Sequence, residues 1–170
     1  MPAPSAPADP HERERRDLAH QALWIVRGSL VLVGTMPWWL PLVKGLLGPI
    51  GIILDALFIV VCHRDPARTL DVLGTAMPVC SRCAGIFSGL ALGAAFAWPK
   101  IPIRIARYAL VVAGLIMLAD VVTQDLGLHP PWHATRLVTG GLLGWVASSA
   151  LVTAIMSERR LAVPRKTSGW

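Results

Sequence analysis

Residues 105–122 read IARYALVVAGLIMLADVV, an apolar run with one basic residue near its start and one acidic residue near its end. A helix needs about 20 such residues to cross the hydrocarbon core of a bilayer. Residues 137–156, LVTGGLLGWVASSALVTAIM, form a second run without any charged side chain. The two runs predict two transmembrane helices joined by a polar turn.

The composition of the whole chain is that of an integral membrane protein. Apolar residues make up 54% and charged residues 15% of the 170 positions, and the mean hydropathy is +0.57. Soluble domains carry about one-quarter charged residues. The net charge of +6 comes from short Lys and Arg clusters between apolar runs, and no continuous basic stripe is present. We therefore expect the lipid bilayer as a partner and no nucleic acid.

Two more apolar stretches lie toward the amino terminus. We expect a helix over residues 84–98, and residues 22–61 are long enough for one full span and a shorter second helix. Three prolines interrupt the second stretch, and Asp55 makes a simple crossing by residues 48–61 costly. The predicted fold is an all-α integral membrane protein, a bundle of about four transmembrane helices plus a short re-entrant or fifth helix.

The chain divides into one domain with two polar ends. We expect a disordered arm over residues 1–20 and a single transmembrane helical domain over residues 21–157. Residues 158–170 are expected to form a basic cytoplasmic tail. The tail and the 99–107 loop hold seven basic residues and one acidic residue, so the positive-inside rule places both in the cytoplasm. The 62–83 loop and the next turn, Gln124 to Thr135, then face outward. The side of the arm depends on whether residues 22–61 cross once or twice.

All three cysteines lie close together in the sequence, in the string CHRDPARTLDVLGTAMPVCSRC at 62–83. Thiolate and imidazole are typical zinc ligands, usually four in a tetrahedral site. Cys80 and Cys83 can hold one face of the ion, and Cys62 and His63 can supply the other ligands. Cys62 and His63 can both bind the ion only if the chain turns at these two residues. If only one of them binds, the protein supplies three ligands and the fourth coordination position is open. Zinc fits these ligands best, and iron or copper is the alternative.

The same cysteines are suited to thiol–disulfide exchange. Cys80 and Cys83 stand at a predicted helix start, whose amides and dipole stabilise a thiolate, and Arg82 adds positive charge. Cys62 can act as a third thiol. The alternative function is a membrane thiol–disulfide oxidoreductase, linked to a quinone by architectural analogy alone. The plainest interpretation is a structural Cys80–Cys83 disulfide or buried inert thiols, and the disulfide would leave one thiol over.

Four motifs in order identify a resemblance: C-H-x-x-P-x-R at 62–68, V-C-x-R-C-x-G-I at 79–86, D-x-x-x-Q at 120–124 and R-x-x-T-G at 136–140. The chain resembles a prokaryotic family of small predicted membrane proteins, the domain-of-unknown-function family 2085, over roughly residues 46–148. The resemblance implies a prokaryotic cell membrane and carries no known activity. The chain departs from the family pattern at Thr69, Leu70, Phe87 and the stretch HPPWH at 129–133.

Polar residues near the predicted outer face allow two interpretations. Asp120 and Gln124 share a helix face, and an ion pair between Asp120 and Arg136 would clamp the turn between two spans. The functional interpretation is an outward cleft beside the cysteines that holds an anionic group, for binding or transport of a lipid headgroup or a prenyl phosphate. Its residues are Arg68, Arg82, Asp120, Gln124 and Arg136.

Small residues recur every four positions on two of the predicted helices. Gly85, Gly89 and Gly93 form one stripe, and Gly140 and Gly144 form the other. Such stripes let membrane helices approach closely. We expect these helices to pack on each other, and a homo-oligomer through either stripe is the alternative.

We therefore predict a multi-pass membrane protein with an outward-facing metal-thiolate site, with zinc as the leading ion and without an assigned role. The sequence has no Gly-rich phosphate loop, nucleophile elbow or H-E-x-x-H motif, so it indicates no enzyme class.

Overall fold

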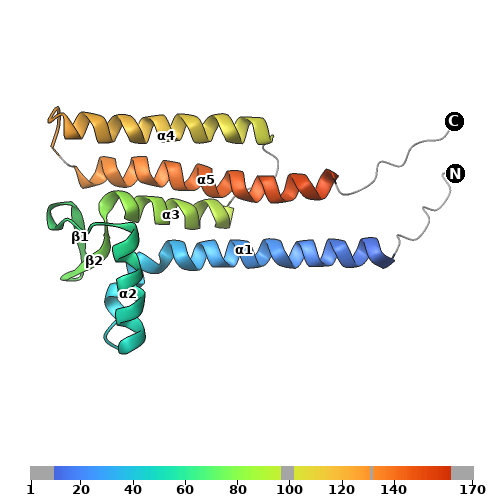
Figure 1. Ribbon diagram of the computed structural model, residues 1–170, viewed down its shortest axis with the longest axis horizontal. Coiled ribbons are helices and arrows are strands. Elements are labelled where there is room, and N and C mark those ends of the chain that lie inside the picture. Colours follow the sequence, from blue (N-terminus) through green and yellow to red (C-terminus); the bar gives the residue numbers. More distant parts are fainter. Residues whose placement is uncertain (1–9, 97–101, 131, 162–170) are drawn as a thin grey trace.

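The computed structural model describes residues 10–96, 102–130 and 132–161. Four helices lie side by side, three of them long and one shorter, and a further short helix and a β-hairpin gather at one end of them (Figure 1). In chain order the elements are α1 (Pro10–Val43), α2 (Pro49–Val61), a 3-10 turn (Pro66–Arg68), β1 (Thr69–Val72), β2 (Thr75–Cys80), α3 (Ser81–Phe96), α4 (Ile103–Asp125) and α5 (His133–Leu161). The predicted class, a helical membrane bundle with a short extra helix, is confirmed.

Three helical segments are long and apolar enough to cross a membrane: Asp17–Val43, Ile103–Asp125 and His133–Met156. The other two apolar helices, α2 and α3, are shorter. Large apolar side chains such as Val111, Leu115 and Leu118 of α4 are exposed. Because lipid is the natural neighbour of such a surface, the bundle presents this face to the bilayer.

The first helix is longer than the sequence indicates. Residues 10–20, expected in a disordered arm, form the first turns of α1, and residues 1–9 lie outside the described part. Pro37 and Pro41 lie inside the helix, although we expected prolines to end it. Both are buried, because α1 packs on α3 and β2 there, and such packing tolerates proline in a membrane helix. The chain bends later, at residues 44–48.

Helix α2 lies crosswise at the end of the bundle instead of alongside the other four helices (Figure 1). Gly48 allows the bend with a positive φ of 54°. Gly51 then meets the Lys44 backbone so closely that a Cβ there would have no room. Because α2 lies crosswise, Cys62 at its carboxyl end lies at the same end of the bundle as the carboxyl end of α1.

A β-hairpin, which the sequence analysis did not predict, occupies much of the expected 62–83 loop. Strands β1 and β2 pair antiparallel, with Thr69 opposite Cys80 and Val72 opposite Thr75. Leu73 and Gly74 connect them, both at positive φ, 51° and 77°. Two-residue hairpin turns of this kind need positive φ at both positions. The hairpin returns the chain from Thr69 to Cys80, directly before α3.

The glycine stripes of α3 and α5 face each other inside one chain. A Cβ on Gly89 would meet Gly141 O and lie 2.7 Å from Trp145 N, and one on Gly140 would meet Arg82 O. The expected packing of the two helices is therefore observed. The same contact covers both stripes, so a second copy of the chain would have to separate the helices to use them.

The ends of the bundle differ in content. The start of α1 and the end of α5 lie together at one end, while the hairpin, α2 and the α4–α5 turn lie at the other (Figure 1). Residues 162–170, most of the predicted tail, lie outside the described part. The hairpin end also carries the main buried cluster, which includes Leu40, Phe58, Cys62, Met77 and Val79.

Candidate metal-thiolate site

Three different elements bring the cysteines together at the hairpin end. Cys62 caps the carboxyl end of α2, Cys80 ends β2, and Cys83 lies in the first turn of α3. Their sulfur atoms all lie within 4.8 Å of one another. All three are free thiols; Cys62 is buried, and Cys80 and Cys83 are partly buried. Three of the four predicted metal ligands therefore form one compact group.

Hydrogen bonds at the start of α3 centre on Cys80. Its backbone N–H donates to the Cys62 sulfur at 3.2 Å. The Cys83 thiol donates a hydrogen bond to the Cys80 sulfur, and this bond lowers the pKa of Cys80 most. Hydrogen bonds from the Cys83 amide, the Cys62 thiol and the Arg82 amide lower it further. Together they outweigh burial, which raises the pKa, and bring the pKa of Cys80 to about 4. The free amides and the positive end of the helix dipole at the start of α3 also favour the thiolate form of Cys80.

His63, the fourth predicted ligand, is exposed and lies outside the sulfur group. The physical reason is the backbone of Cys62, which is extended at φ −144° and ψ 133°. Consecutive side chains on extended backbone point to opposite sides. Since the Cys62 side chain turns inward, the next side chain turns out.

An ion pair that the sequence analysis missed fixes α2 to the hairpin. Arg64 donates from Nη1 to Asp55 Oδ2 at 3.1 Å and from Nη2 to the Asp55 carbonyl, and from Nε to the Pro78 carbonyl at 2.9 Å. Arg64 itself has a positive φ of 51°. These bonds tie the residues flanking Cys62 to the strand that ends at Cys80. The sequence signal for this ion pair was Asp55, because a charged residue in an apolar helix is costly unless it has a partner.

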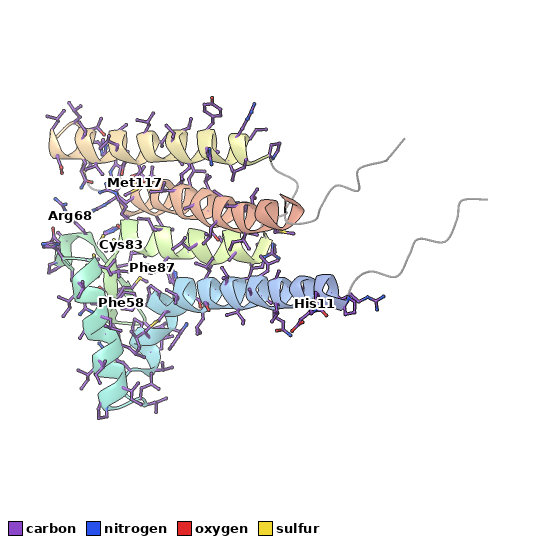
Figure 2. All side chains as sticks on the ribbon, turned by 45° about the vertical axis from the view of Figure 1, so that its right-hand side comes forward. His11, Phe58, Arg68, Cys83, Phe87 and Met117 are labelled. Carbon is purple, nitrogen blue, oxygen red and sulfur yellow. The ribbon has the colours of Figure 1, made fainter. Side chains whose placement is uncertain are left out.

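Apolar side chains cover the inner side of the sulfur group. Val79 is fully buried between Pro78 and Cys80, and Phe58 packs edge-on against Phe87 with ring centroids 5.5 Å apart. Figure 2 shows Phe58, Phe87 and Cys83 at this same end of the bundle. A low-dielectric wall on one side strengthens electrostatic attraction between thiolates and a cation.

The predicted polar cleft is divided into two pairs and one isolated charge. Arg82 Nη2 bonds Asp120 Oδ2 at 2.7 Å and Gln124 Oε1 at 3.1 Å, and Thr139 donates to the same Asp120 oxygen at 3.4 Å. Arg68 pairs with Asp65 at 3.1 Å. The structure thus corrects the expected Asp120–Arg136 pair, because Arg82 reaches Asp120 from α3.

Arg136 remains as a buried guanidinium in the first turn of α5. It is 3% exposed, and its Nε and Nη1 atoms have no hydrogen-bond partner in the part of the chain that the structure describes. Desolvated charges are expensive unless paired and hydrogen-bonded. Arg136 therefore requires an explanation beyond packing.

Comparison with known proteins supports the membrane character and gives no activity. The family described as "Predicted membrane protein (DUF2085)" matches residues 62–150, which include all three cysteines and Arg136. The uncharacterized protein MJ1492 of Methanocaldococcus jannaschii is 33% identical over 104 residues, 56% of this chain and 64% of that protein. An uncharacterized protein of Methanothermobacter thermautotrophicus is 34% identical over 83 residues, 47% of this chain and 74% of that protein. No solved structure gives a significant match.

Proposed function

Because the chain belongs to the DUF2085 family of predicted membrane proteins, we propose that it is a multi-pass membrane protein that binds a metal ion, zinc foremost, on the thiolates of Cys62, Cys80 and Cys83. One observation carries the proposal: three sulfur atoms from three elements lie within 4.8 Å of one another. Zinc–sulfur bonds of about 2.3 Å in a tetrahedron put the sulfur atoms about 3.8 Å apart. A small inward movement of the thiolates therefore completes three sides of a site.

The donor set favours zinc and leaves one position open. Thiolates bind zinc, Cu(I) and iron, and zinc adapts best to a site built from backbone loops and a helix start. His63 is exposed, so we assign the fourth position to solvent or an exogenous ligand. An open position is the feature that separates catalytic from purely structural zinc sites.

We further propose that the site is on the outer face of a prokaryotic cell membrane, with the carboxyl terminus in the cytoplasm. The basic residues Arg104 and Arg107 lie near the start of α4, at the opposite end of that helix from the α4–α5 turn (Figure 1). In the sequence, Lys100 precedes them and four more basic residues follow residue 157. Leu128 is exposed in the α4–α5 turn and offers a test. A Leu128→Cys variant should react with a membrane-impermeant maleimide in intact cells, and labelling only after lysis would reverse the orientation.

Elemental analysis of detergent-purified protein tests the metal site. We expect about one zinc per chain in the wild type and less than about one-tenth of that in Cys80→Ser, because thiolate binding supplies most of the affinity. His63→Ala is the matched control and should retain the metal. Loss of metal from His63→Ala would make this residue the fourth ligand, and metal-free wild-type protein would end the proposal.

Thiol–disulfide exchange is the second candidate, favoured by the low pKa of Cys80. Its thiolate is the nucleophile that exchange needs, with Cys83 or Cys62 as the resolving thiol. Oxidation of the Cys80 thiolate and one thiol to a disulfide would release two electrons and one proton, and a quinone would take these with a second proton from solvent to give the quinol. Metal-free protein whose Cys80–Cys83 disulfide forms as added ubiquinone is reduced would establish this function instead.

A further inference from the structure

The first turns of α3 and α5 gather buried polar atoms without partners. Besides Arg136 Nε and Nη1, these are Ser81 Oγ, Arg82 Nε and His133 Nδ1, none of which bonds any residue in the described ranges. Ser81 is fully buried. Native proteins satisfy nearly all of their buried polar atoms, so five such atoms at one end of two helices indicate an absent ligand.

The packing of α3 on α5 places these atoms together. A Cβ on Gly85 would meet the Leu137 backbone, and one on Gly140 would meet the Arg82 backbone, so both helices start at the same level. Ser81 lies one turn before Gly85 on the same face. Helical side chains tilt toward the amino terminus, so Arg136 projects toward the start of α3. The donors of Ser81, His133 and Arg136 therefore belong to the same end of the packed pair of helices, where α3 and α5 begin.

The charges around this point favour an anion. Arg82, Cys80, Arg68 and Asp120 are the charged groups that act on Arg136. Asp120 and Asp65 already pair with the other two arginines. Cys80 attracts Arg136, but no hydrogen bond joins them. Among these groups, only the Arg136 guanidinium lacks both a carboxylate and a hydrogen-bond acceptor.

We propose that Arg136, Ser81 and His133 bind a phosphate-type oxyanion directly beside the three-cysteine cluster. A guanidinium donates two parallel hydrogen bonds to phosphate, and hydroxyl and imidazole donors can reach its remaining oxygen atoms. A single water molecule offers too few acceptors for donors that come from two helices. The ligand is either free phosphate or the phosphate of a lipid headgroup. The oxyanion site does not require the proposed metal, so the two proposals can fail separately.

Binding to the full-length wild-type protein is the first test. Inorganic phosphate is titrated into detergent-purified protein by calorimetry, and thermal unfolding is compared in a phosphorus-free detergent with and without added phosphatidic acid. A response to inorganic phosphate alone identifies a soluble ligand, and a rise in unfolding temperature with phosphatidic acid alone identifies a lipid headgroup. Either response supports the site, and no response to either probe overturns it.

Variants then locate the binding. Arg136→Gln should weaken binding at least about tenfold, and Ser81→Ala should weaken it less, because a charge-assisted bidentate contact is stronger than one hydroxyl. Arg136→Lys keeps the charge but loses the fork, so it should rescue binding only in part. Arg104→Gln, an exposed position near the start of α4, is the control. Equal binding by wild type, Ser81→Ala and Arg136→Lys would refute the assignment even if Arg136→Gln does not fold.

Discussion

Cys80 donates its backbone N–H to the sulfur of Cys62, eighteen residues earlier, at 3.2 Å. The contact joins the end of α2 to the start of α3 across the hairpin. The amides of Arg82 and Cys83 at the start of α3 bond the Cys80 sulfur and support negative charge there. The backbone thus favours a thiolate at Cys80 and holds the Cys62 sulfur beside it before any cation arrives, which lowers the reorganisation needed for binding.

Replacement of Arg64 by alanine should weaken metal binding although Arg64 is not a ligand. The change removes the bonds from α2 and from the Pro78 carbonyl that hold Cys62 near Cys80. We expect about tenfold weaker zinc binding in competition with a chelator, because second-shell partners are typically worth about 10–100-fold. Arg68→Ala is the control, since its exposed pair with Asp65 is worth less than about 1 kcal/mol. Equal losses in both variants would contradict the role of Arg64.

Alkylation of metal-free protein should reveal the low pKa of Cys80. A thiol of ordinary pKa, about 8.5, reacts about tenfold more slowly for each pH unit below that value. Because the pKa of Cys80 is about 4, its reaction with iodoacetamide should be nearly constant from about pH 8 to pH 5 and should fall only near pH 4. Peptide mass spectrometry measures the extent of alkylation at Cys80 at each pH.

Cys83→Ala supplies the control for that measurement. Loss of the Cys83 thiol removes the strongest hydrogen bond to the Cys80 sulfur, so the pKa of Cys80 should rise and its labelling at pH 6 should slow. A wild-type rate that already falls tenfold per unit from pH 8 would show that Cys80 is an ordinary thiol.

Asp120→Asn should destabilise the bundle by about 3 kcal/mol, because it leaves Arg82 charged and unpaired in a mostly buried position. Unfolding in a mixed-detergent titration measures the change. The double variant Arg82→Gln/Asp120→Asn should lose less stability than the sum of the losses in the two single variants. Additive losses would mean that the two side chains do not interact.

Gly89→Ala should separate α3 from α5. Its Cβ would collide with the backbone of Gly141 and Trp145, and overpacking of this kind costs about 1–3 kcal/mol or more. Gly114→Ala is the matched control, since nothing lies within 4 Å of a Cβ there, and helix propensity should make it neutral or slightly stabilising. A stable Gly89→Ala variant would contradict the close packing.

Periodicity and composition were sufficient to predict the long helices, because an apolar run in lipid must satisfy its own backbone hydrogen bonds. The ends of the helices were harder to predict. The prolines of α1 stay inside the helix because neighbouring elements cover them, and that depends on contacts from residues more than forty positions away, such as the bond from Trp38 to Ser88 at 2.7 Å.

The candidate site was predicted in composition but not in geometry. The spacing of Cys80 and Cys83 is local, so their proximity could be foreseen. The approach of Cys62 depends on a hairpin whose turn is Leu73–Gly74, and leucine at positive φ gives almost no sequence signal. The choice of Arg82 over Arg136 as partner of Asp120 depends on how α5 packs against both α3 and α4 (Figure 1), and only tertiary structure decides that.

The sixteen described residues of α3 rise about 24 Å, whereas the hydrocarbon core is about 30 Å thick. Either the bilayer thins around this helix, or its first turn begins below the level of the lipid headgroups. Non-helical backbone is tolerated at that depth only when protein covers it, and β2 is covered by β1, α1 and α2. The thiolates would then open toward the boundary between headgroups and acyl chains, a position that a molecule dissolved in the membrane reaches without first entering water.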